Sequence, residues 1–483
     1  MLEGLEARVL QYSSLKNEID KTFRLDAEHY RKKYQISISK LSNLTTQRLG
    51  SLLSIPVCTG HTPSMQNDSF YGGSVKFIKT DNVRENKITD FFTDYLSDKG
   101  ASELKKSNLI SGDVITTIIG ATYDVVGRAA MVTDELLPAN INQNIALIRC
   151  NSNKINPYFL NCYLNTYIGR AMLHYHSRQT EQVNLNCREV ERVLVPIFNN
   201  EFQKSIEELY KKSEKIILDS KIAYQTAQNL LLEHLGLKDF NPPLQKFNIK
   251  SFSNSFGTSG RLDAEFYQEK YEGYLKKIQA YPYGCEPIRT ACKLKDANYT
   301  PKDNQTYQYI ELSNIGNLGE ITGASLDLGC NLPSRARRKV SKNDVIVSSV
   351  EGSLASCAIV SEQYHQALCS TGFYVVSSEK INSETLLILF KSEPIQQLLK
   401  QGCSGTILTA INKDEFLNIP LPLVDANIQT QIADLIRQSN YLRIKSKGLL
   451  EKAKKAVELA IEKDQESALD FIKGKQTNDC NVH

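Results

Sequence analysis

The sequence predicts an α+β protein with an internal repeat. Two similar mixed α/β domains are separated by two long antiparallel helices, which form a coiled coil with pseudo-twofold symmetry. Three observations predict this fold. One helical pattern occurs twice, over 203–231 and 429–457, and shorter motifs ahead of each copy recur in the same order. Each half also contains short runs rich in β-branched residues and bounded by glycine, as strands are.

The two predicted helices carry an apolar seam in steps of three and four residues, which is typical of helices that pack lengthwise. Ile206 of the first copy matches Ile432 of the second, and Ser213 matches Ser439 without any gap in register. At about 1.5 Å per residue, a helix of roughly 30 residues is about 45 Å long. The shared register disfavours two unrelated surface helices.

The duplication extends to the domains. Arg24–Tyr30 returns as Arg261–Tyr267, and Asp113-Val114-Ile115 returns as Asp344-Val345-Ile346. The offset shrinks along the chain, as expected of two copies that differ by loop insertions. The expected strands are Ser74–Ile78 and Gly112–Ile119, with Tyr309–Leu312 and Val345–Val350 as counterparts; the expected helices are Pro157 to about Leu173 and Ser383–Leu399.

These boundaries divide the chain into seven segments. In order they are an entry segment (1–23), the first domain (24–198), the central helix (199–236), a linker (237–260), the second domain (261–424), the C-terminal helix (425–466) and a flexible tail (467–483).

Composition excludes several protein classes. The 483 residues carry a net charge of only +4, so local clusters must carry any argument for nucleic-acid binding. We find no apolar run of about 18 residues and no secretory signal, so we expect a cytoplasmic protein without a membrane partner. The 11 cysteines include no C-x-x-C pair, which argues against disulfides and against a metal site.

One stretch looks catalytic. Asn241-Pro242-Pro243 resembles the active-site loop of amino-group DNA methyltransferases, but Leu244 replaces the aromatic residue that would stack on a base. The glycine-rich run 256–260 follows no clear strand, so it lacks the strand-to-helix junction of a cofactor loop. We therefore favour a linker here, and we assign no catalytic residue. The sequence indicates a binding protein or scaffold.

Polar and basic loops are the candidates for nucleic-acid contact, with ordinary solvated loops as the alternative. Asn and Gln can bond adenine bidentately, and Arg can bond guanine. Arg335–Lys339 is the densest cationic run. The candidate DNA-binding residues are Thr62, Ser64, Lys79, Asn82, Arg84, Asn142, Gln143, Arg178 and Gln179 in the first half, and Thr300, Asn314, Arg335, Arg337, Arg338, Lys339, Ser370 and Thr371 in the second.

The order of these motifs, and its doubling, resembles the specificity subunits of type I restriction–modification systems. The matching marks are the doubled Arg-Leu-Asp-Ala-Glu-x-Tyr entry, Gly60-x-Thr62-Pro63-Ser64, Gly112-Asp113-Val114, Ser370-Thr371-Gly372-Phe373 and Ile419–Leu423 leading into Gln429. The chain departs from the family at Val195-Pro196-Ile197, where Pro-Leu-Pro is usual, and the second copy lacks a counterpart of Gly72-Gly73.

The resemblance implies that each domain reads one half of a split, asymmetric target in double-stranded DNA, while the helices set the gap. It implies no active site in this chain. Two methyltransferase subunits would bring S-adenosylmethionine, and a restriction and translocase subunit using ATP and magnesium can join them. The helices would dock these partners through Ile206, Leu209, Ile216, Leu230, Ile432, Leu435, Leu442 and Leu449. The alternatives are a coiled-coil adaptor for proteins and a solitary DNA methyltransferase.

Overall fold

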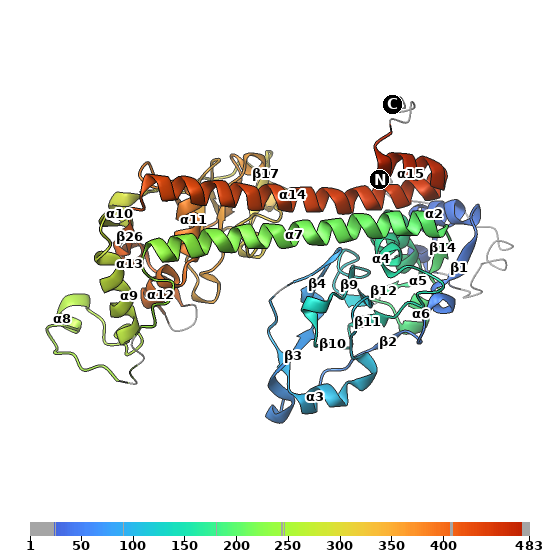
Figure 1. The fold of residues 1–483 in the computed structure, drawn as a ribbon, viewed down its shortest axis with the longest axis horizontal. Helices are drawn as coiled ribbons and strands as arrows, with labels where there is room; N and C mark the ends of the chain where they lie inside the picture. Colours follow the sequence, from blue (N-terminus) through green and yellow to red (C-terminus); the bar gives the residue numbers. More distant parts are fainter. Residues whose placement is uncertain are drawn as a thin grey trace. The chain divides into compact units, whose positions relative to one another are not determined.

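The computed structural model describes residues 24, 26–89, 91–179, 181–242, 245, 247–405 and 409–475 (Figure 1). The chain forms two compact units. Unit 1 comprises Met1–Lys215 with Lys445–His483, and unit 2 comprises Ile216–Ile444. The predicted entry segment 1–23 lies outside the described residues, as do Pro243 and Leu244 of the methyltransferase-like stretch.

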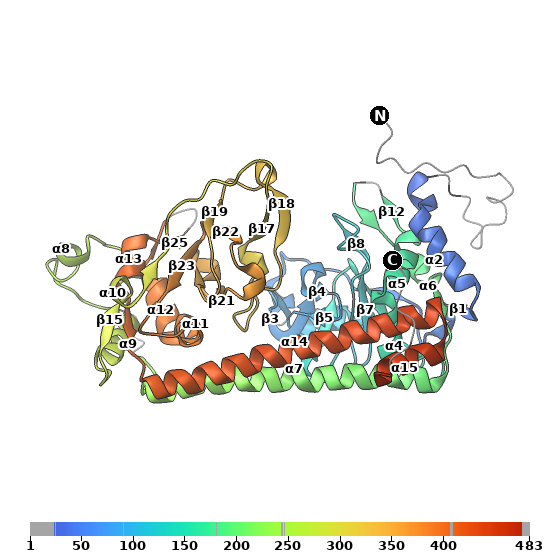
Figure 2. The same cartoon turned by 90° about the horizontal axis from the view of Figure 1, so that it is seen from above.

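Two long helices each contribute to both units. They are α7 (Asn200–His234) and α14 (Ala426–Glu462). In unit 1 the hydroxyl groups of Ser213 and Ser446 lie 2.7 Å apart, and in unit 2 those of Ser220 and Ser439 lie 3.0 Å apart. The chain advances by seven residues on α7 and returns by seven on α14 between these pairs, so the helices are antiparallel, as predicted. Figure 2 shows them side by side.

Among the described residues, unit 1 contains five small sheets. Their orders are β1-β14, β10-β3-β6, β2-β11-β7-β9, β12-β13-β8 and β4-β5. The strands are β1 (Thr46–Arg48), β2 (Cys58–Thr59), β3 (Tyr71–Ile78), β4 (Val83–Arg84), β5 (Lys87–Ile88), β6 (Tyr95–Leu96), β7 (Val114–Thr117), β8 (Ile119–Gly120), β9 (Ala129–Met131), β10 (Ala139–Ile141), β11 (Ile145–Ile148), β12 (Arg178–Gln179), β13 (Val183–Asn184) and β14 (Leu194–Pro196). The helices that precede α7 are α2 (Lys32–Ser42), α3 (Asp98–Glu103), α4 (Pro157–Asn165), α5 (Tyr167–His176) and α6 (Cys187–Glu191).

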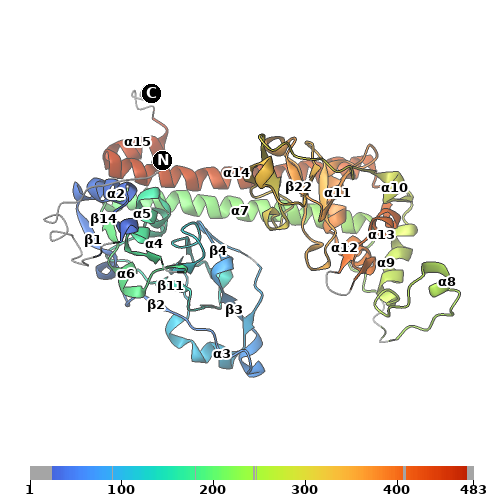
Figure 3. The ribbon, with the colours of Figure 1, turned by 180° about the vertical axis from the view of Figure 1, so that it is seen from behind.

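Where the structure describes it, unit 2 contains four sheets, ordered β15-β26, β16-β23-β20-β21, β18-β17-β22-β19 and β24-β25. Figure 2 shows β17, β18, β19 and β22 together, and Figure 3 shows α9, α10, α12 and α13 gathered in this unit. The strands are β15 (Cys285–Pro287), β16 (Lys293–Leu294), β17 (Thr306–Ile310), β18 (Ser325–Leu328), β19 (Ala336–Lys339), β20 (Val345–Ser348), β21 (Cys357–Ile359), β22 (Leu368–Ser370), β23 (Phe373–Ser377), β24 (Cys403–Ser404), β25 (Ala410–Ile411) and β26 (Pro420–Pro422). The helices are α8 (Phe256–Ser259), α9 (Glu269–Gln279), α10 (Ile288–Ala291), α11 (Ser383–Lys391), α12 (Glu393–Gln401) and α13 (Lys413–Asn418).

The two units repeat one topology, which confirms the predicted fold class. The sheet β2-β11-β7-β9 of unit 1 has the same chain order as β16-β23-β20-β21 of unit 2. Each unit also pairs two strands in parallel, β10 with β3 and β22 with β17. The main core of each unit includes residues from both long helices, such as Phe202 and Val457 in unit 1 and Leu231 and Ile436 in unit 2.

The doubled Arg-Leu-Asp motif is a structural clasp in both units. Arg24 pairs with Asp26 at 2.8 Å and donates to the carbonyl oxygens of Tyr175 and His176, where α5 ends. Arg261 pairs with Asp263 at 2.6 Å and donates to the carbonyls of Gln401 and Cys403 beside the end of α12. A cation at a helix C-terminus offsets the partial negative charge of its carbonyl groups, so the motif holds the start of each domain against the helix end.

The doubled Asp-Val-Ile motif places a buried carboxylate at the start of a core strand. Asp113 pairs with Arg149 at 2.8 Å, and Asp344 pairs with Lys295 at 2.7 Å. The residue before each aspartate has a positive φ, +85° at Gly112 and +67° at Asn343. Only glycine, asparagine and aspartate adopt this region readily, which explains why these residue types stand here.

Three expectations about secondary structure were wrong. The single helix expected from Pro157 to Leu173 is two helices, because Thr166 ends α4 and its hydroxyl accepts the backbone N–H of Gly169 to start α5. The helix expected over Ser383–Leu399 is also two helices, because Ser392 ends α11 and begins α12 with an extended backbone. The tail expected to be flexible from residue 467 instead contains α15 (Gln465–Lys473), whose Ala468 is fully buried. The amphipathic spacing of its apolar residues gives this short helix a face to bury. No helix within the described ranges is long and apolar enough to cross a membrane.

Candidate nucleic-acid interface

In unit 1, two candidate loops meet at the end of β10. The hydroxyl of Thr62 donates to the side-chain oxygen of Gln143 at 2.7 Å, and both residues are exposed. Asn142 is 6% exposed, and its side-chain oxygen accepts the backbone N–H of Asn144 at 3.1 Å. Asn142 therefore shapes the loop, while Thr62 and Gln143 present an uncharged polar pair to solvent.

The matching place in unit 2 is the end of β22. Ser370 is 6% exposed, and its hydroxyl accepts the backbone N–H of Gly372 at 3.2 Å, as Asn142 does for Asn144. Thr371 is exposed, and its backbone N–H donates to the carbonyl oxygen of Arg335 at 2.9 Å. This contact brings the candidate loop after β22 against the cationic run that precedes and forms β19.

The cationic run of unit 2 is partly engaged within the chain. Arg337 donates to the carbonyl of Ser334 at 3.1 Å and to the hydroxyl of Thr300 at 3.4 Å. The ammonium of Lys339 lies 5.1 Å from the ring centre of Tyr299. Arg338 is half-buried, and its Nη1 has no hydrogen-bond partner among the described residues. Thr300, Arg335, Arg337 and Lys339 are thus neighbours, as the sequence alone did not show.

Two candidate asparagines are turn residues. The side-chain oxygen of Asn82 accepts the backbone N–H of Lys79 at 2.8 Å, and its amide donates to the carbonyl of Phe91 at 2.7 Å. In unit 2 the side-chain oxygen of Asn314 accepts the backbone N–H of Glu311 at 2.8 Å. These repeated contacts close the turn after β3 and after β17, so both side chains are committed to the fold.

The basic candidates of unit 1 lie next to acids or backbone carbonyls. Lys79 is ion-paired with Asp94, and this contact lowers the pKa of the Asp94 carboxyl against the opposing effect of burial. Arg178 pairs with Glu189 at 3.1 Å, and Arg84 donates to the carbonyl of Val83 at 3.2 Å. Ser64 is exposed, whereas the side chain of Gln179 lies outside the described residues.

The helix residues assigned to partner docking mostly face inward. Ile206 and Ile432 are 0% exposed and belong to the unit cores, and Leu209 and Ile216 are also buried. Leu230, Leu435, Leu442 and Leu449 are half-buried. A fully buried side chain cannot meet a partner unless the chain opens, so the seam holds the two helices together instead.

The two long helices also expose large apolar side chains, which the seam spacing did not predict. Leu218 and Ile222 on α7 are 43% and 54% exposed, and Tyr441 and Ile444 on α14 are 62% and 71% exposed. Leu218 and Tyr441 fit the register set by the serine pairs, so they lie at the same level in unit 2. In the sequence, each of these apolar residues lies between seam positions, outside the spacing of three and four residues that defines the seam.

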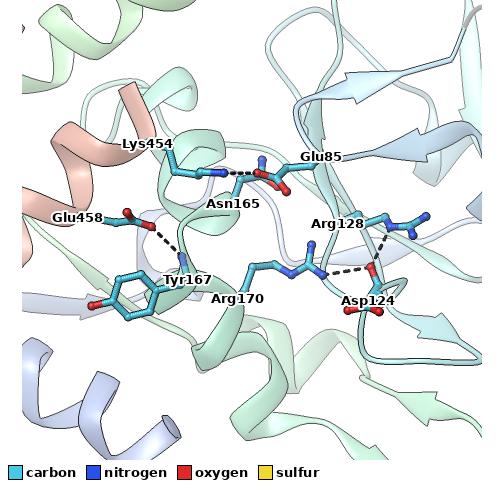
Figure 4. Close-up of a pocket in the computed structure, with 8 residues that line it drawn as sticks. All are labelled: Glu85, Asp124, Arg128, Asn165, Tyr167, Arg170, Lys454 and Glu458. Carbon is cyan, nitrogen blue, oxygen red and sulfur yellow. Dashed lines mark hydrogen bonds and ion pairs between the residues drawn. The ribbon is translucent and has the colours of Figure 1, made fainter. Parts of the chain in front are cut away.

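A charged pocket in unit 1 was also missed. Lys454 of α14 pairs with Glu85 at 2.8 Å, and Glu458 of α14 accepts the backbone N–H of Tyr167 at 3.1 Å (Figure 4). Arg128 and Arg170 both donate to the carbonyl oxygen of Asp124. The lining residues come from four separate stretches of chain, so their spacing in the sequence carries no signal. They are Glu85, Asp124, Arg128, Asn165, Tyr167, Arg170, Lys454 and Glu458.

The comparisons with known proteins agree on one family. Residues 287–455 match the family model described as the type I restriction modification DNA specificity domain. Over 400 residues the chain is 22% identical to a Methanocaldococcus jannaschii protein named as a type I restriction enzyme MjaX specificity subunit, an alignment that covers 81% of this chain and 87% of that protein.

Two solved structures are similar over nearly their whole length. The S subunit of a type I restriction–modification system from M. genitalium is 11% identical, with a TM-score of 0.36 and coverage of 89% and 96% of the two chains. The HsdS subunit from Thermoanaerobacter tengcongensis is 14% identical, with a TM-score of 0.29 and coverage of 89% and 97%. By the family model over residues 287–455, the relative aligned over 400 residues and the doubled motifs, this chain is similar to the specificity subunits of type I restriction–modification systems.

Proposed function

We propose that this chain is the DNA-recognition subunit of a type I restriction–modification complex, in which each unit reads one half of a bipartite target. The observation that carries the proposal is the repeat itself. Both units bring polar loops together at the end of the same parallel strand pair, yet the loop chemistry differs. Matched scaffolds with unlike loops suit two unlike half-sites, and thus an asymmetric target.

We further propose that the chain acts without an active site of its own. Two methyltransferase subunits bind S-adenosylmethionine and flip the target adenine out of the duplex. A restriction and translocase subunit that uses ATP and magnesium joins the same assembly. The exposed apolar residues of α7 and α14 support docking of such partners, because large exposed apolar side chains on paired helices usually mark an interface.

The continuous helices suit a ruler that fixes the gap between half-sites. The register of the serine pairs allows both long helices to be shortened together, by deleting residues 214–220 of α7 and 439–445 of α14. This change keeps Ser213 opposite Ser446 and rejoins each helix after a whole heptad. Seven residues correspond to about 10 Å of helix, or roughly three base pairs. The heptad differs from two full turns by only about 20°, so the face of each helix is nearly maintained.

Genome-wide adenine methylation maps of the source cell test both statements. We compare wild type, a strain lacking this gene, and a strain with the joint deletion. The expected result is one methylated motif of two unlike blocks, lost without the gene, and with a gap shortened by about three base pairs in the deletion strain. Identical maps with and without the gene, while a partner methyltransferase is expressed, overturn the recognition role. A deletion strain that methylates the original spacing overturns the ruler alone.

A further inference from the structure

Each unit carries a pair of exposed cations in a short segment ahead of a fully buried strand, β7 in unit 1 and β20 in unit 2. The unit 1 pair is Lys105 and Lys106, and the unit 2 pair is Arg335 and Lys339. Within the part of the chain that the structure describes, none of the four ion-pairs with an acid, and Lys339 only lies over the ring of Tyr299. Their charges are therefore available to a ligand outside the chain.

Backbone hydrogen bonds place the two segments at the same point of the repeated scaffold. The N–H of Leu109 donates to the carbonyl of Ala139 at 3.2 Å, and the N–H of Val340 donates to the carbonyl of Ala367 at 3.0 Å. Ala139 begins β10 and Ala367 directly precedes β22, the second strands of the two parallel pairs. The match holds for the segments and not for single residues, because β19 contains a bulge and Lys105–Ser107 is a 3-10 helix.

A second contact brings each segment against the stretch that runs into the Thr-Pro pair of its unit. In unit 1 the thiol of Cys58 donates to the carbonyl oxygen of Lys106 at 3.3 Å. In unit 2 the backbone N–H of Tyr299 donates to the carbonyl oxygen of Arg337 at 2.8 Å. Both cation pairs thus extend from a backbone that is fixed beside the polar loops of the candidate interface.

Charge at the same place in both units points to a ligand that the two half-sites share. The polar loops beside the segments differ in residue type, as two unlike half-sites require. Bases differ between such half-sites, whereas the phosphate backbone does not. A phosphate also needs a cation whose charge is not already neutralised, unlike that of Lys342, which pairs with Glu362 at 2.6 Å.

We propose that Lys105 with Lys106, and Arg335 with Lys339, bind backbone phosphates of the half-site that each unit meets, without reading its sequence. The proposal rests on the proposed function and adds the ligand chemistry and the residues to it. Lysine supplies a compact charge on a flexible stem, and arginine supplies a fork that can bond two phosphate oxygens. Either side chain satisfies a phosphate, which explains why the charge recurs although the residue type does not.

The test measures Kd against salt for the full chain assembled with its methyltransferase subunits, on the target that the methylation maps define. Each cation pair is replaced by alanine in turn, and a control removes two exposed cations that are already bonded, Lys154 to the Ser51 carbonyl and Lys342 to Glu362. The variants are Lys105→Ala/Lys106→Ala, Arg335→Ala/Lys339→Ala, Lys154→Ala/Lys342→Ala and the charge-keeping Lys105→Arg/Lys106→Arg.

Each of the first two variants should lower the slope of log Kd against log salt by about 2, at about 0.9 for each phosphate contact. Their base preference should stay unchanged at every position of a randomised target library. The control should change the slope by well under 1, and the charge-keeping variant should retain the wild-type slope.

Neutral methylphosphonate groups, placed one at a time in the target, identify the contacted phosphates. Wild type should lose affinity at particular positions in both half-sites. The Lys105→Ala/Lys106→Ala variant should become insensitive to these positions in one half-site only, and Arg335→Ala/Lys339→Ala in the other half-site only.

Three results would overturn the proposal. They are a slope change no larger than that of the control, a loss of discrimination at particular base pairs, and an effect confined to one of the two units. If wild type itself shows no preference for a bipartite target, the proposed function fails, and this is visible before any variant is compared.

Discussion

The two units have the same scaffold, but their candidate loops differ in charge. In unit 1 the exposed pair Thr62 and Gln143 is uncharged, and Lys79 and Arg178 lie against acids. In unit 2 the run Arg335–Lys339 gathers beside Thr371 and Thr300 without an ion pair to an acid among the described residues. The comparison indicates that the two copies kept the scaffold contacts while the residues of their loops diverged. The clasp and the buried aspartates recur in both units, whereas the loops at the end of the parallel strands do not.

The units also anchor a hairpin loop to the long helices by different contacts. In unit 1 the side-chain oxygen of Asn86 accepts the hydroxyl of Tyr210 of α7 at 2.6 Å. In unit 2 the carboxylate of Glu320 pairs with Arg443 of α14 at 3.2 Å. Each contact ties a loop that follows the turn asparagine to a helix. The requirement for an anchor is shared, but the residues that meet it are not.

Acid should affect unit 1 most strongly, because two buried histidines lie at the end of α5. Burial lowers the pKa of His174 to about 4 and that of His176 to about 3, whereas the matching helix α12 carries no histidine. The folded pKa lies below the unfolded value near 6.5, so the unfolded chain binds more protons as the pH falls. Stability is therefore lost between about pH 6.5 and pH 4, by roughly 3 kcal/mol from His174 alone.

Hydrogen exchange of the β7 and β20 amides measures this effect in each unit. Protection in β7 should fall faster with acid than protection in β20. In a His174→Asn variant the β7 slope should flatten over the same pH range. Equal acid slopes in both units, or an unchanged slope in the variant, would show that these histidines do not set the difference.

Removing a buried aspartate should weaken only its own unit. Asp113 and Asp344 are 1% and 2% exposed, and each pairs with a partly exposed cation. Replacing either by alanine leaves a cation without its partner, at a cost of about 2–3 kcal/mol after allowance for solvent around that cation. The measurement is again amide protection, in β7 for Asp113→Ala and in β20 for Asp344→Ala.

A surface pair provides the matched control for the aspartates. Asp296→Ala removes a carboxylate of similar type that pairs with Lys413, but both side chains are well exposed. Its cost should be below about 1 kcal/mol. A loss of protection in both units from Asp113→Ala alone would contradict the separation of the scaffolds.

The smallest effect concerns salt, and it rests on the proposed function. Lys339 is exposed and has no acid partner among the described residues, so Lys339→Ala should lower the slope of log Kd against log salt by about 1 for the assembled complex. The double variant Lys79→Ala/Asp94→Ala removes a pair that is already neutral and should change the slope less. A larger change in the double variant would make Lys79 a phosphate contact instead.

The sequence alone determined the repeat, the fold class and the long helices. These follow from local periodicity and from motifs that recur in order, such as Arg24 with Arg261 and Asp113 with Asp344. Both kinds of signal lie within short windows of the chain, and duplication doubles them. The same reasoning also located the loops that carry Thr62, Gln143 and Arg335.

Only the tertiary structure decided which of the candidate side chains, in those loops and on the long helices, are free to contact a partner. Asn82 and Asn314 close turns, Ile206 and Ile432 are buried, and Arg335 extends unpaired beside Thr371. It also assembled the pocket of Glu85, Lys454 and Glu458 from distant stretches. Hydrogen bonds, ion pairs and burial depend on atoms that meet through space. The sequence specifies which side chains can form hydrogen bonds and ion pairs, and the tertiary structure determines which of them are already bonded within the chain.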